Sequence, residues 1–400
     1  MERFDAIVIG TGGMGAAALM HLAARGARVC GLDRFPPGHD RGSSHGQTRL
    51  IRLAYFEHPD YVPLLRRAYE LWRELETASG RPLLVESGLL MAGPPDGEVL
   101  AGAVASATIH SLPIERMTSH EAMCRWPGIR LPEEWAAVHE AQAGYLYVED
   151  CVRGHAAEAV RLGARIEHGD TVRGWRSVGP DGGGGHIVVE TDRGSYAADR
   201  LVVTAGAWAA DILQLPSLPL RVLRKSLFWY GSEAAVRGTH AADSLPCFAF
   251  DAPAGFFYGF PAVDARGVKI AEHTGGTPVD DPLAVDRGID ARERARLEAV
   301  VATHLPAVSG HLTDHAVCLY TMSPDGHFVV GHHPQHARVT IAAGFSGHGF
   351  KFASVMGEVL ADLALAGKTA LPIGFLSPKR FFSGENSPGS KGTPPPCRES

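Results

Sequence analysis

The sequence has few cysteines, and nothing in their arrangement indicates a disulfide framework or a metal site. The six cysteines are scattered and none forms a C-x-x-C pair. No stretch reaches the roughly 18 uninterrupted apolar residues of a membrane-spanning helix, and the N-terminus enters a predicted strand without the apolar segment of a signal peptide. We therefore expect a cytoplasmic protein with no metal and no membrane partner.

The charge of the chain has no strong bias. The 400 residues hold 38 Lys and Arg against 44 Asp and Glu, a net charge of −6 with the two signs interspersed. No basic stripe is present to neutralise a phosphate backbone, so we expect no nucleic-acid partner. Hydrophobic residues make up 45% and charged residues 20%, which excludes a mainly disordered chain. At roughly 150 residues per domain, the length allows two or three domains.

The first 33 residues predict a strand–helix–strand unit. Residues 6–9 form a continuous apolar run, typical of a strand buried on both faces of a parallel sheet. The turn that follows has the G-x-G-x-x-G pattern, made by Gly10, Gly12 and Gly15, and Asp33 ends the next strand. Such a turn holds a pyrophosphate at the helix N-terminus, and the acidic residue binds ribose hydroxyls. The pattern predicts a dinucleotide site without choosing between NAD and FAD.

Later segments predict a second domain threaded through the first. The apolar runs 201–207 and 339–344 each end in small residues and resemble further strands of the first sheet. The segments between them alternate in strand fashion, are rich in aromatics and predict a largely antiparallel domain. We assign 1–90, 145–215 and 315–382 to the nucleotide domain, 91–144 and 216–314 to the second domain, 182–185 to a hairpin tip, and 383–400 to a disordered tail.

Five segments resemble the monomeric sarcosine oxidase and N-methyltryptophan oxidase family. They are SSHGQTRLIR at 43–52, YGFP at 258–261, VKIAEH at 268–273, CLYTMSPD at 318–325 and GFSGHGFKF at 344–352. In order and spacing, the resemblance covers residues of about 4 to 380. It implies an α/β fold of the glutathione-reductase type, with a doubly wound FAD domain and a second domain built on a mixed or antiparallel sheet. It also implies a monomeric FAD-dependent oxidoreductase that acts on CH–NH donors with O2.

The resemblance assigns substrate and cofactor roles to individual residues. Cys318 matches the cysteine that carries FAD covalently at the flavin 8α carbon. Arg52 and Lys351 match the pair that binds the substrate carboxylate, for which a guanidinium fork and an ammonium point charge are suited. Tyr258 and His273 match polar residues of the substrate cavity, where His273 positions the substrate or a proton.

Two further cations are expected beside the flavin. Arg49 matches the residue that stabilises negative charge on the reduced ring, and Lys269 matches the residue of the oxygen site, where a cation stabilises superoxide. The remaining predicted cofactor contacts extend along the whole chain. With the residues already named they are Gly10, Gly12, Gly13, Met14, Gly15, Asp33, Arg34, Ser43, Ser44, His45, Thr48, Arg49, Val172, Ala205, Gly206, Cys318, Gly344, Gly347, His348, Gly349 and Lys351.

The predicted activity is oxidative demethylation of an N-methyl amino acid with O2, giving the amino acid, formaldehyde and H2O2. Three alternatives remain open: an oxidase of cyclic secondary amino acids such as pipecolate or proline, a dehydrogenase that passes electrons to another acceptor, and a flavin-binding subunit without turnover. An NAD-linked dehydrogenase is disfavoured because it leaves Cys318 without a role. Gln47 and Gly331 depart from the family pattern, in which acidic residues are frequent at both positions. Ala249, between two phenylalanines, suggests a pocket larger than sarcosine needs.

Overall fold

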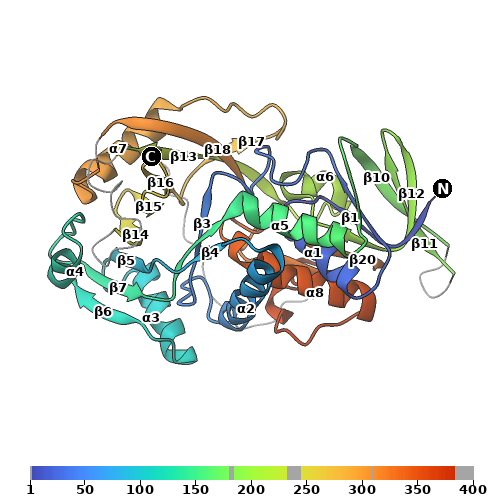
Figure 1. The fold of residues 1–400 in the computed structure, drawn as a ribbon, viewed down its shortest axis with the longest axis horizontal. Coiled ribbons are helices and arrows are strands. Elements are labelled where there is room, and N and C mark those ends of the chain that lie inside the picture. Colours follow the sequence, from blue (N-terminus) through green and yellow to red (C-terminus); the bar gives the residue numbers. More distant parts are fainter. Residues whose placement is uncertain (1, 180–183, 232–244, 309, 383–400) are drawn as a thin grey trace.

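The computed structural model describes residues 2–179, 184–231, 245–308 and 310–382. The chain folds into two halves, each built around one large sheet (Figure 1). Within the described ranges, no helix combines the length and the apolarity needed to cross a bilayer. The α/β class and the nucleotide-domain architecture agree with the prediction.

The first half is organised around β1 (Arg3–Ile9), which lies parallel to both β2 (Val29–Asp33) and β12 (Gly194–Val203). The sheet has eight strands in the order β10-β11-β12-β1-β2-β9, with β20 (His336–Ala343) also parallel to β12 and β19 paired with β20. Successive side chains of β1 point to opposite faces of the sheet, so that Val8 packs in the hydrophobic core on one face and Ile7 in the core on the other. The predicted strand–helix–strand unit and both later strands of this sheet are therefore confirmed.

Helices cover the first sheet close to the glycine-rich turn. Helix α1 (Gly13–Ala24) packs between α5 (Val148–Arg161) and α8 (Ala353–Ala366), and α2 (Tyr61–Ser79) packs on α8 (Figure 1). Gly357 permits this packing, because a Cβ there would lie 2.5 Å from the Ala17 backbone. The other elements of this half are β9 (Arg165–His168), β10 (Val172–Val178), β11 (His186–Thr191), α6 (Ala209–Leu213), β19 (Val329–His333) and short 3-10 turns at Gly206–Trp208, Phe350–Phe352, Gly374–Leu376 and Pro378–Phe381.

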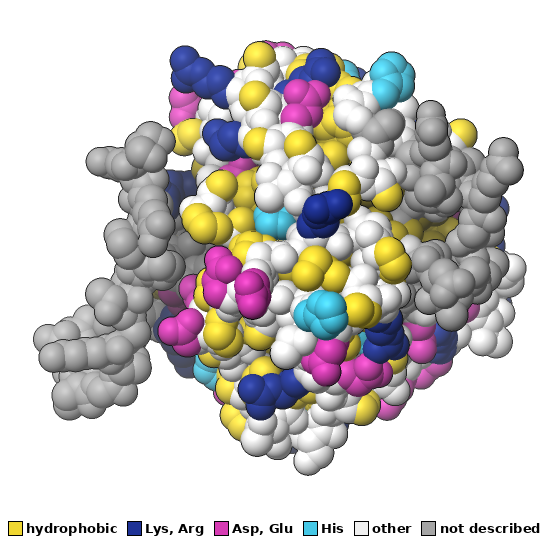
Figure 2. Space-filling view, turned by 90° about the vertical axis from the view of Figure 1, so that its left-hand side faces the viewer, with side chains coloured by type: hydrophobic (Ala, Val, Ile, Leu, Met, Phe, Trp, Pro, Cys, Tyr) yellow, Lys and Arg dark blue, Asp and Glu magenta, His cyan; other side chains and the backbone are white. Residues whose placement is uncertain are grey.

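The second half is organised around a mixed nine-stranded sheet. Its order is β17-β13-β16-β15-β14-β5-β7-β6, with β18 paired to β13, and only the β14–β5 pair is parallel. Its elements are β5 (Leu89–Gly93), α3 (Glu98–His110), β6 (Glu115–Thr118), α4 (Ser119–Arg125), β7 (Ala136–Glu140), β13 (Arg221–Tyr230), β14 (Cys247–Ala252), β15 (Gly255–Phe260), β16 (Val268–Glu272), β17 (Thr277–Val279), α7 (Ala291–His304) and β18 (Leu312–Met322). A third, small sheet has the order β3 (Thr48–Ile51), β8 (Gly144–Tyr147), β4 (Leu84–Val85). On the outer face of this half, charged side chains of both signs mix with apolar ones (Figure 2).

One face of the nine-stranded sheet carries most of the predicted chemistry. Residues directly opposite each other in an antiparallel pair share a face, and so do residues two apart on one strand. Tyr258 pairs with Ala249 on one side and Ala271 on the other, and Lys225 pairs with Cys318. Alternation along the strands places Lys269 on the face of Ala271. The sheet thus presents lysines, a tyrosine and the cysteine toward the first half.

The predicted domain division remains a prediction at its boundaries. The division at residue 315 falls inside β18, whose whole length pairs with β13 of the second sheet. Part of the predicted hairpin tip at 182–185, and the predicted tail at 383–400, lie outside the described residues.

Candidate active site

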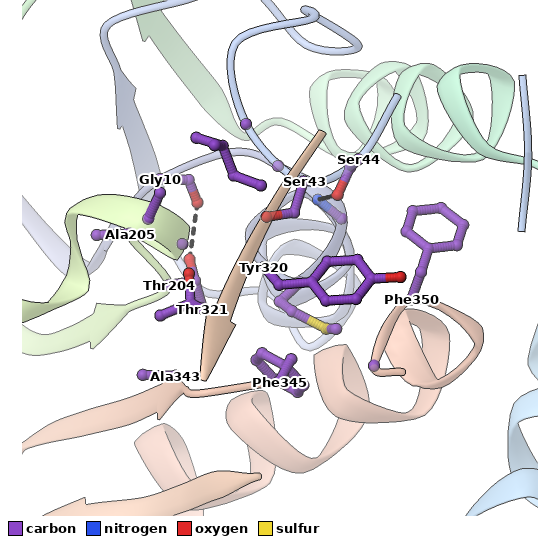
Figure 3. A pocket seen from close by; sticks show the side chains of 18 of the residues that line it. Gly10, Ser43, Ser44, Thr204, Ala205, Tyr320, Thr321, Ala343, Phe345 and Phe350 are labelled. Atoms are coloured by element: carbon purple, nitrogen blue, oxygen red, sulfur yellow. Dashed lines mark hydrogen bonds between the residues drawn. The ribbon is translucent and has the colours of Figure 1, made fainter. Parts of the chain in front are cut away.

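A large cavity lies between the two halves of the molecule and is lined by residues of both. Its walls come from the β1–α1 turn, the end of β2, the segment 42–57, the strand ends after β12 and β20, and strands β14, β15 and β18. Tyr320 projects its ring into it (Figure 3). Segments distant in sequence therefore converge on one binding space.

The β1–α1 turn reaches the cavity through close backbone contacts. Gly10 has a φ of +89°, and a Cβ there would lie 2.5 Å from the Thr204 carbonyl oxygen. The Thr204 hydroxyl donates to the Gly10 carbonyl at 2.7 Å (Figure 3). A Cβ at Gly15 would lie 1.7 Å from the Gly10 oxygen, whereas a Cβ at Gly12 would meet nothing within 4 Å. Gly10 and Gly15 thus close the turn, and Gly12 leaves space for a ligand beside the helix N-terminus.

The nucleotide end of the cavity holds polar atoms that lack partners. Arg34 Nη1, Trp208 Nε1 and the Thr321 hydroxyl are buried with no hydrogen bond, and all three residues line the cavity. Asp33 is fixed beside them, because its Oδ2 accepts from the Thr11 backbone N–H at 2.6 Å. Buried unpaired donors are costly and indicate a missing acceptor. The phosphate, ribose and adenine groups of FAD supply such partners, so these residues fit the cofactor that the sequence predicts.

Arg49 and Cys318 lie in direct contact. Arg49 Nη2 is 3.1 Å from Cys318 Sγ and donates to the Ser43 carbonyl at 2.9 Å, and Nη1 donates to the Thr48 carbonyl at 2.9 Å. The Cys318 thiol also contacts the Ser43 oxygen at 3.4 Å. Cys318 itself is buried, and its neighbours Leu319 and Tyr320 line the cavity. The structure therefore brings together a thiol and a fixed cation that the sequence separates by 269 positions.

Lys269 is buried directly behind the cavity wall. Its ammonium donates to the carbonyls of Gly46 at 2.5 Å and Thr48 at 2.8 Å, and it faces the Phe260 ring at 4.7 Å. Burial lowers the pKa of this lysine well below its usual range. The Gly46 turn that accepts from it is held in turn by Glu149, which accepts from the Gly46 N–H at 2.6 Å. Sequence reasoning did not single out Glu149.

Arg52 and Lys351 meet at the other end of the cavity. Arg52 Nη2 donates to both carboxylate oxygens of Glu57, at 2.8 and 2.7 Å, and its guanidinium lies 4.3 Å from the Tyr55 ring centre. The Lys351 ammonium donates to the His348 carbonyl at 2.8 Å and lies 3.5 Å from the Tyr55 hydroxyl. Both cations are buried and line the cavity. Together they make this end of the cavity positively charged, and the carboxylate of Glu57 is the anion that pairs with Arg52 there.

Burial and neighbouring charges set the protonation of this end. Burial, and then the positive charge of Arg52, lower the pKa of Lys351 to about 7. For Glu57, burial favours the neutral acid, but Arg52, His348 and Lys351 outweigh it and lower the pKa to about 2. Burial lowers the pKa of His348 to about 4. At neutral pH, Glu57 is therefore ionised and His348 neutral, while Lys351 is near its midpoint.

Aromatic and imidazole rings form another part of the cavity wall. The hydroxyls of Tyr258 and Tyr320 share a hydrogen bond of 3.3 Å, and the His273 ring centre lies 5.6 Å from that of Tyr320. Burial, and then Lys225, lower the pKa of His273 to about 3, so its imidazole is neutral. Gly347 permits the approach of Tyr320, because a Cβ there would lie 2.2 Å from the ring. This wall presents hydroxyls and a neutral imidazole to a ligand.

Most of the predicted site residues line the cavity. They are Gly10, Gly12, Gly13, Met14, Asp33, Arg34, Ser43, Ser44, Arg49, Arg52, Val172, Ala205, Gly206, Tyr258, His273, Gly344, Gly347, His348, Gly349 and Lys351. The others are buried beside residues that line it, namely Gly15, His45, Thr48, Lys269 and Cys318. Their roles in binding and catalysis remain predictions.

Several residues of the site were missed in the sequence. Besides Glu57 and Glu149, they include Tyr320 and Glu140, whose buried carboxylate accepts from the backbone N–H groups of Leu53 and Ala54 at 2.6 and 2.9 Å. Glu140 thereby fixes the backbone just after Arg52. An acidic residue at the end of the apolar strand β7 was the available signal.

Comparison with known proteins gives consistent matches over nearly the whole chain. The family described as FAD dependent oxidoreductase matches residues 5–363. The chain is 40% identical over 382 residues to monomeric sarcosine oxidase of Streptomyces avermitilis, covering 94% of this chain and 98% of that protein. It is 36% identical over 375 residues to N-methyl-L-tryptophan oxidase of Salmonella enteritidis PT4, covering 92% and 96%.

A solved structure supports the same relationship. The chain resembles NikD, an unusual amino acid oxidase essential for nikkomycin biosynthesis, in its open form, with a TM-score of 0.82 and 27% identity over 94% of this chain and 98% of that chain.

Proposed function

Because the chain belongs to the FAD-dependent oxidoreductase family, we propose that it demethylates N-methyl amino acids with O2, giving the free amino acid, formaldehyde and H2O2. It works as a monomer in the cytoplasm. The monomeric state is supported by the description of the Streptomyces relative as monomeric. The observation that carries the proposal is the convergence of Arg52 and Lys351 at one end of a cavity whose other end is the Gly10–Gly15 turn.

Arg52 and Lys351 bind the α-carboxylate of the substrate. A guanidinium offers two parallel N–H donors and the ammonium adds a third from the side of Tyr55. Glu57 must release at least part of its hold on Arg52 when the substrate carboxylate enters, because both anions need the same donors. The site therefore selects amino acids over simple amines.

The uncharged part of the cavity wall, formed by Tyr258, Tyr320 and His273, binds the amine group of the substrate. His273, with its depressed pKa, is a hydrogen-bond acceptor for the amine N–H, and the hydroxyls of Tyr258 and Tyr320 border the same space. When bound, FAD would supply the oxidant: it would accept two electrons, as a hydride equivalent, from the CH–NH group of the amine, whose C–N bond becomes the C=N bond of an imine, and the electrons would then reduce O2 to H2O2. Hydrolysis of the resulting imine separates formaldehyde from the amino acid. Arg49 holds a fixed positive charge beside the predicted flavin position.

Cys318 is the proposed covalent attachment point for FAD. In support, its thiol adjoins the Arg49 guanidinium, and the three residues that come after it on β18, Leu319 to Thr321, line the cavity. Lys269 is the proposed oxygen-site cation, supported by its buried position behind the 46–48 turn.

A substrate panel tests the proposed function. Purified holoenzyme is mixed with sarcosine, N-methyl-L-tryptophan, L-pipecolate and L-proline, and H2O2 and formaldehyde are both measured. We expect an N-methyl amino acid to give the two products in equal amounts. Peroxide without formaldehyde, from a cyclic substrate only, would identify a cyclic amino-acid oxidase. Turnover only with an artificial electron acceptor would identify a dehydrogenase.

A further inference from the structure

Lys225 is a buried lysine that none of the proposed chemistry uses. It lies on β13 with only 4% of its surface exposed, on the sheet face that also carries Cys318. Its ammonium donates to three consecutive carbonyls, those of His273 at 3.0 Å, Thr274 at 2.6 Å and Gly275 at 3.1 Å. Among the described residues, no carboxylate lies within 4 Å of it. All three N–H bonds of the ammonium are thus committed to one turn.

The turn and the lysine are shaped for each other. Gly275 and Gly276 have φ values of +64° and +116°, which direct three successive carbonyls toward one point. A Cβ at Gly276 would lie 2.9 Å from Lys225 Cδ, so the glycine makes room for the lysine stem. Burying an ammonium is costly unless its hydrogen bonds are replaced, and here the turn replaces all of them. An apolar side chain of equal length would fill the space but leave the three carbonyls without this donor.

The same ammonium also contacts the aromatic wall of the cavity. It lies 5.3 Å from the ring centre of Tyr320, a cation–π distance. Tyr320 touches His273, the first residue of the turn, and shares a hydrogen bond with Tyr258. One cation outside the cavity wall therefore fixes the backbone of one wall residue and the ring of another.

We propose that Lys225 is a positioning residue for the substrate cavity. Lys225 holds His273 and Tyr320 in the geometry that binds the substrate, and does not itself touch the substrate. The inference rests on the proposed function of the cavity. If the wall is pre-organised by Lys225, removing the ammonium loosens it and weakens binding of the amino acid, while the reacting groups themselves stay in place.

The test compares Lys225→Met with a matched control, Arg296→Met. Methionine keeps the length and apolar stem of the lysine but has no charge. Arg296 is an exposed cation that pairs with Glu272, close to the same turn, so its replacement removes one charge from the same region. For Lys225→Met we expect the KM for the N-methyl substrate to rise roughly tenfold, with kcat changed less than about threefold and FAD content unchanged. The control is expected to leave KM within about twofold.

Two measurements that need no turnover separate this proposal from the proposed function. Titration with acetate, a carboxylate that is not an amine, is followed through the flavin absorbance spectrum, and its affinity should change little because Arg52 and Lys351 are intact. Amide hydrogen exchange at 273–276 should accelerate in Lys225→Met and not in Arg296→Met. These results hold even if the substrate panel identifies another amine.

A second variant covers the case in which Lys225→Met does not fold. Gly276→Ala keeps the ammonium but places a methyl group against its stem and strains the turn, so it should raise KM in the same direction. An unchanged KM and unchanged exchange at 273–276 in Lys225→Met would overturn the proposal. An equal rise of KM in both Lys225→Met and Arg296→Met would also overturn it, since the effect would then be one of general charge.

Discussion

One guanidinium nitrogen of Arg52, Nη2, donates to both carboxylate oxygens of Glu57, at 2.8 and 2.7 Å, at the place where the proposed substrate carboxylate binds. The protein thus carries an internal anion that competes with its substrate for the same donors. Lys351, whose ammonium lies near the Tyr55 hydroxyl, has no carboxylate among its described hydrogen bonds. The two cations therefore contribute differently to binding.

Replacing Glu57 tests this competition. In Glu57→Gln the guanidinium loses its anionic partner, so a substrate carboxylate no longer displaces an ion pair. We expect the KM for the N-methyl substrate to fall by roughly tenfold, equivalent to about 1.4 kcal/mol, with kcat little changed. Steady-state kinetics with peroxide detection measure both constants. A higher KM would show that Glu57 orients Arg52 for the substrate and does not oppose it.

The pKa of Lys351 predicts how carboxylate binding depends on pH. Burial lowers this pKa to about 7, so the ammonium is charged below pH 7 and loses its charge as the pH rises through it. Glu57, with a pKa of about 2, and His273, with a pKa of about 3, do not change charge in this range. We expect acetate to bind roughly 10 to 100 times more weakly on the alkaline side, the value of one charge-assisted hydrogen bond.

Lys351→Arg is the control for this pH effect. A guanidinium stays charged throughout, so the acetate affinity of this variant should be flat within about one pH unit on either side of 7. The affinity is read from the flavin absorbance spectrum. A wild-type affinity that does not change with pH would contradict the assignment of Lys351 to the carboxylate.

Covalent attachment at Cys318 predicts a simple result for Cys318→Ser. Wild-type protein precipitated with acid should stay yellow and show flavin fluorescence in a denaturing gel, whereas the variant should release its FAD. Cys247→Ser is the matched control, because Cys247 is also a buried free cysteine of the second sheet. Release of FAD from the wild-type protein would show that the flavin is not covalently bound, and its retention in Cys318→Ser would place the attachment at another residue.

The position of Lys269 predicts a defect confined to oxygen. In Lys269→Met we expect anaerobic reduction by the substrate to proceed at close to the wild-type rate, while reoxidation by O2 slows at least a hundredfold, about 2.7 kcal/mol of lost anion stabilisation. Stopped-flow absorbance resolves the two steps. The exposed Lys368 serves as a control through Lys368→Met. If both steps slow equally in Lys269→Met, the lysine supports the 46–48 turn and not the reaction with O2.

Ala249 predicts which substrates the cavity admits. It lines the cavity beside Tyr258 on the neighbouring strand, and it is the smallest side chain in that part of the wall. Ala249→Leu adds volume there, so kcat/KM for N-methyl-L-tryptophan should fall at least tenfold, while that for sarcosine changes by less than about threefold. Equal losses for both substrates would place the bulky group of the substrate elsewhere.

The sequence predicts best those parts of the site that depend on local pattern. The Gly10–Gly15 turn follows from its glycines and from the apolar runs on either side, because both conformation and burial are encoded within about 30 residues. The family resemblance identifies the cations and the cysteine, and it implies that they lie close together. In the structure, Arg49 of the segment 43–52 contacts Cys318 of β18.

Family resemblance predicts a role for Lys269, but its burial and contacts, like those of Lys225, depend on partners distant in sequence and could not be predicted from local pattern. Lys269 has the alternating position of an exposed strand residue, yet it is buried, because the segment 46–48 covers that face of the sheet. The Lys225 ammonium donates to carbonyls at 273–275, which lie 48 to 50 positions away in the sequence. The shape of this turn is defined only in the folded chain. Nothing in local composition marks either lysine as different from a surface residue.

Anaerobic titration of the wild-type holoenzyme with an N-methyl amino acid tests the central claim most directly. If the cationic end formed by Arg52 and Lys351 binds an amino acid for oxidation at the flavin, one equivalent of substrate should bleach the flavin absorbance completely, and admitted O2 should restore it with release of one equivalent of H2O2. Persistence of the full yellow spectrum in the presence of excess sarcosine and N-methyl-L-tryptophan would contradict the account.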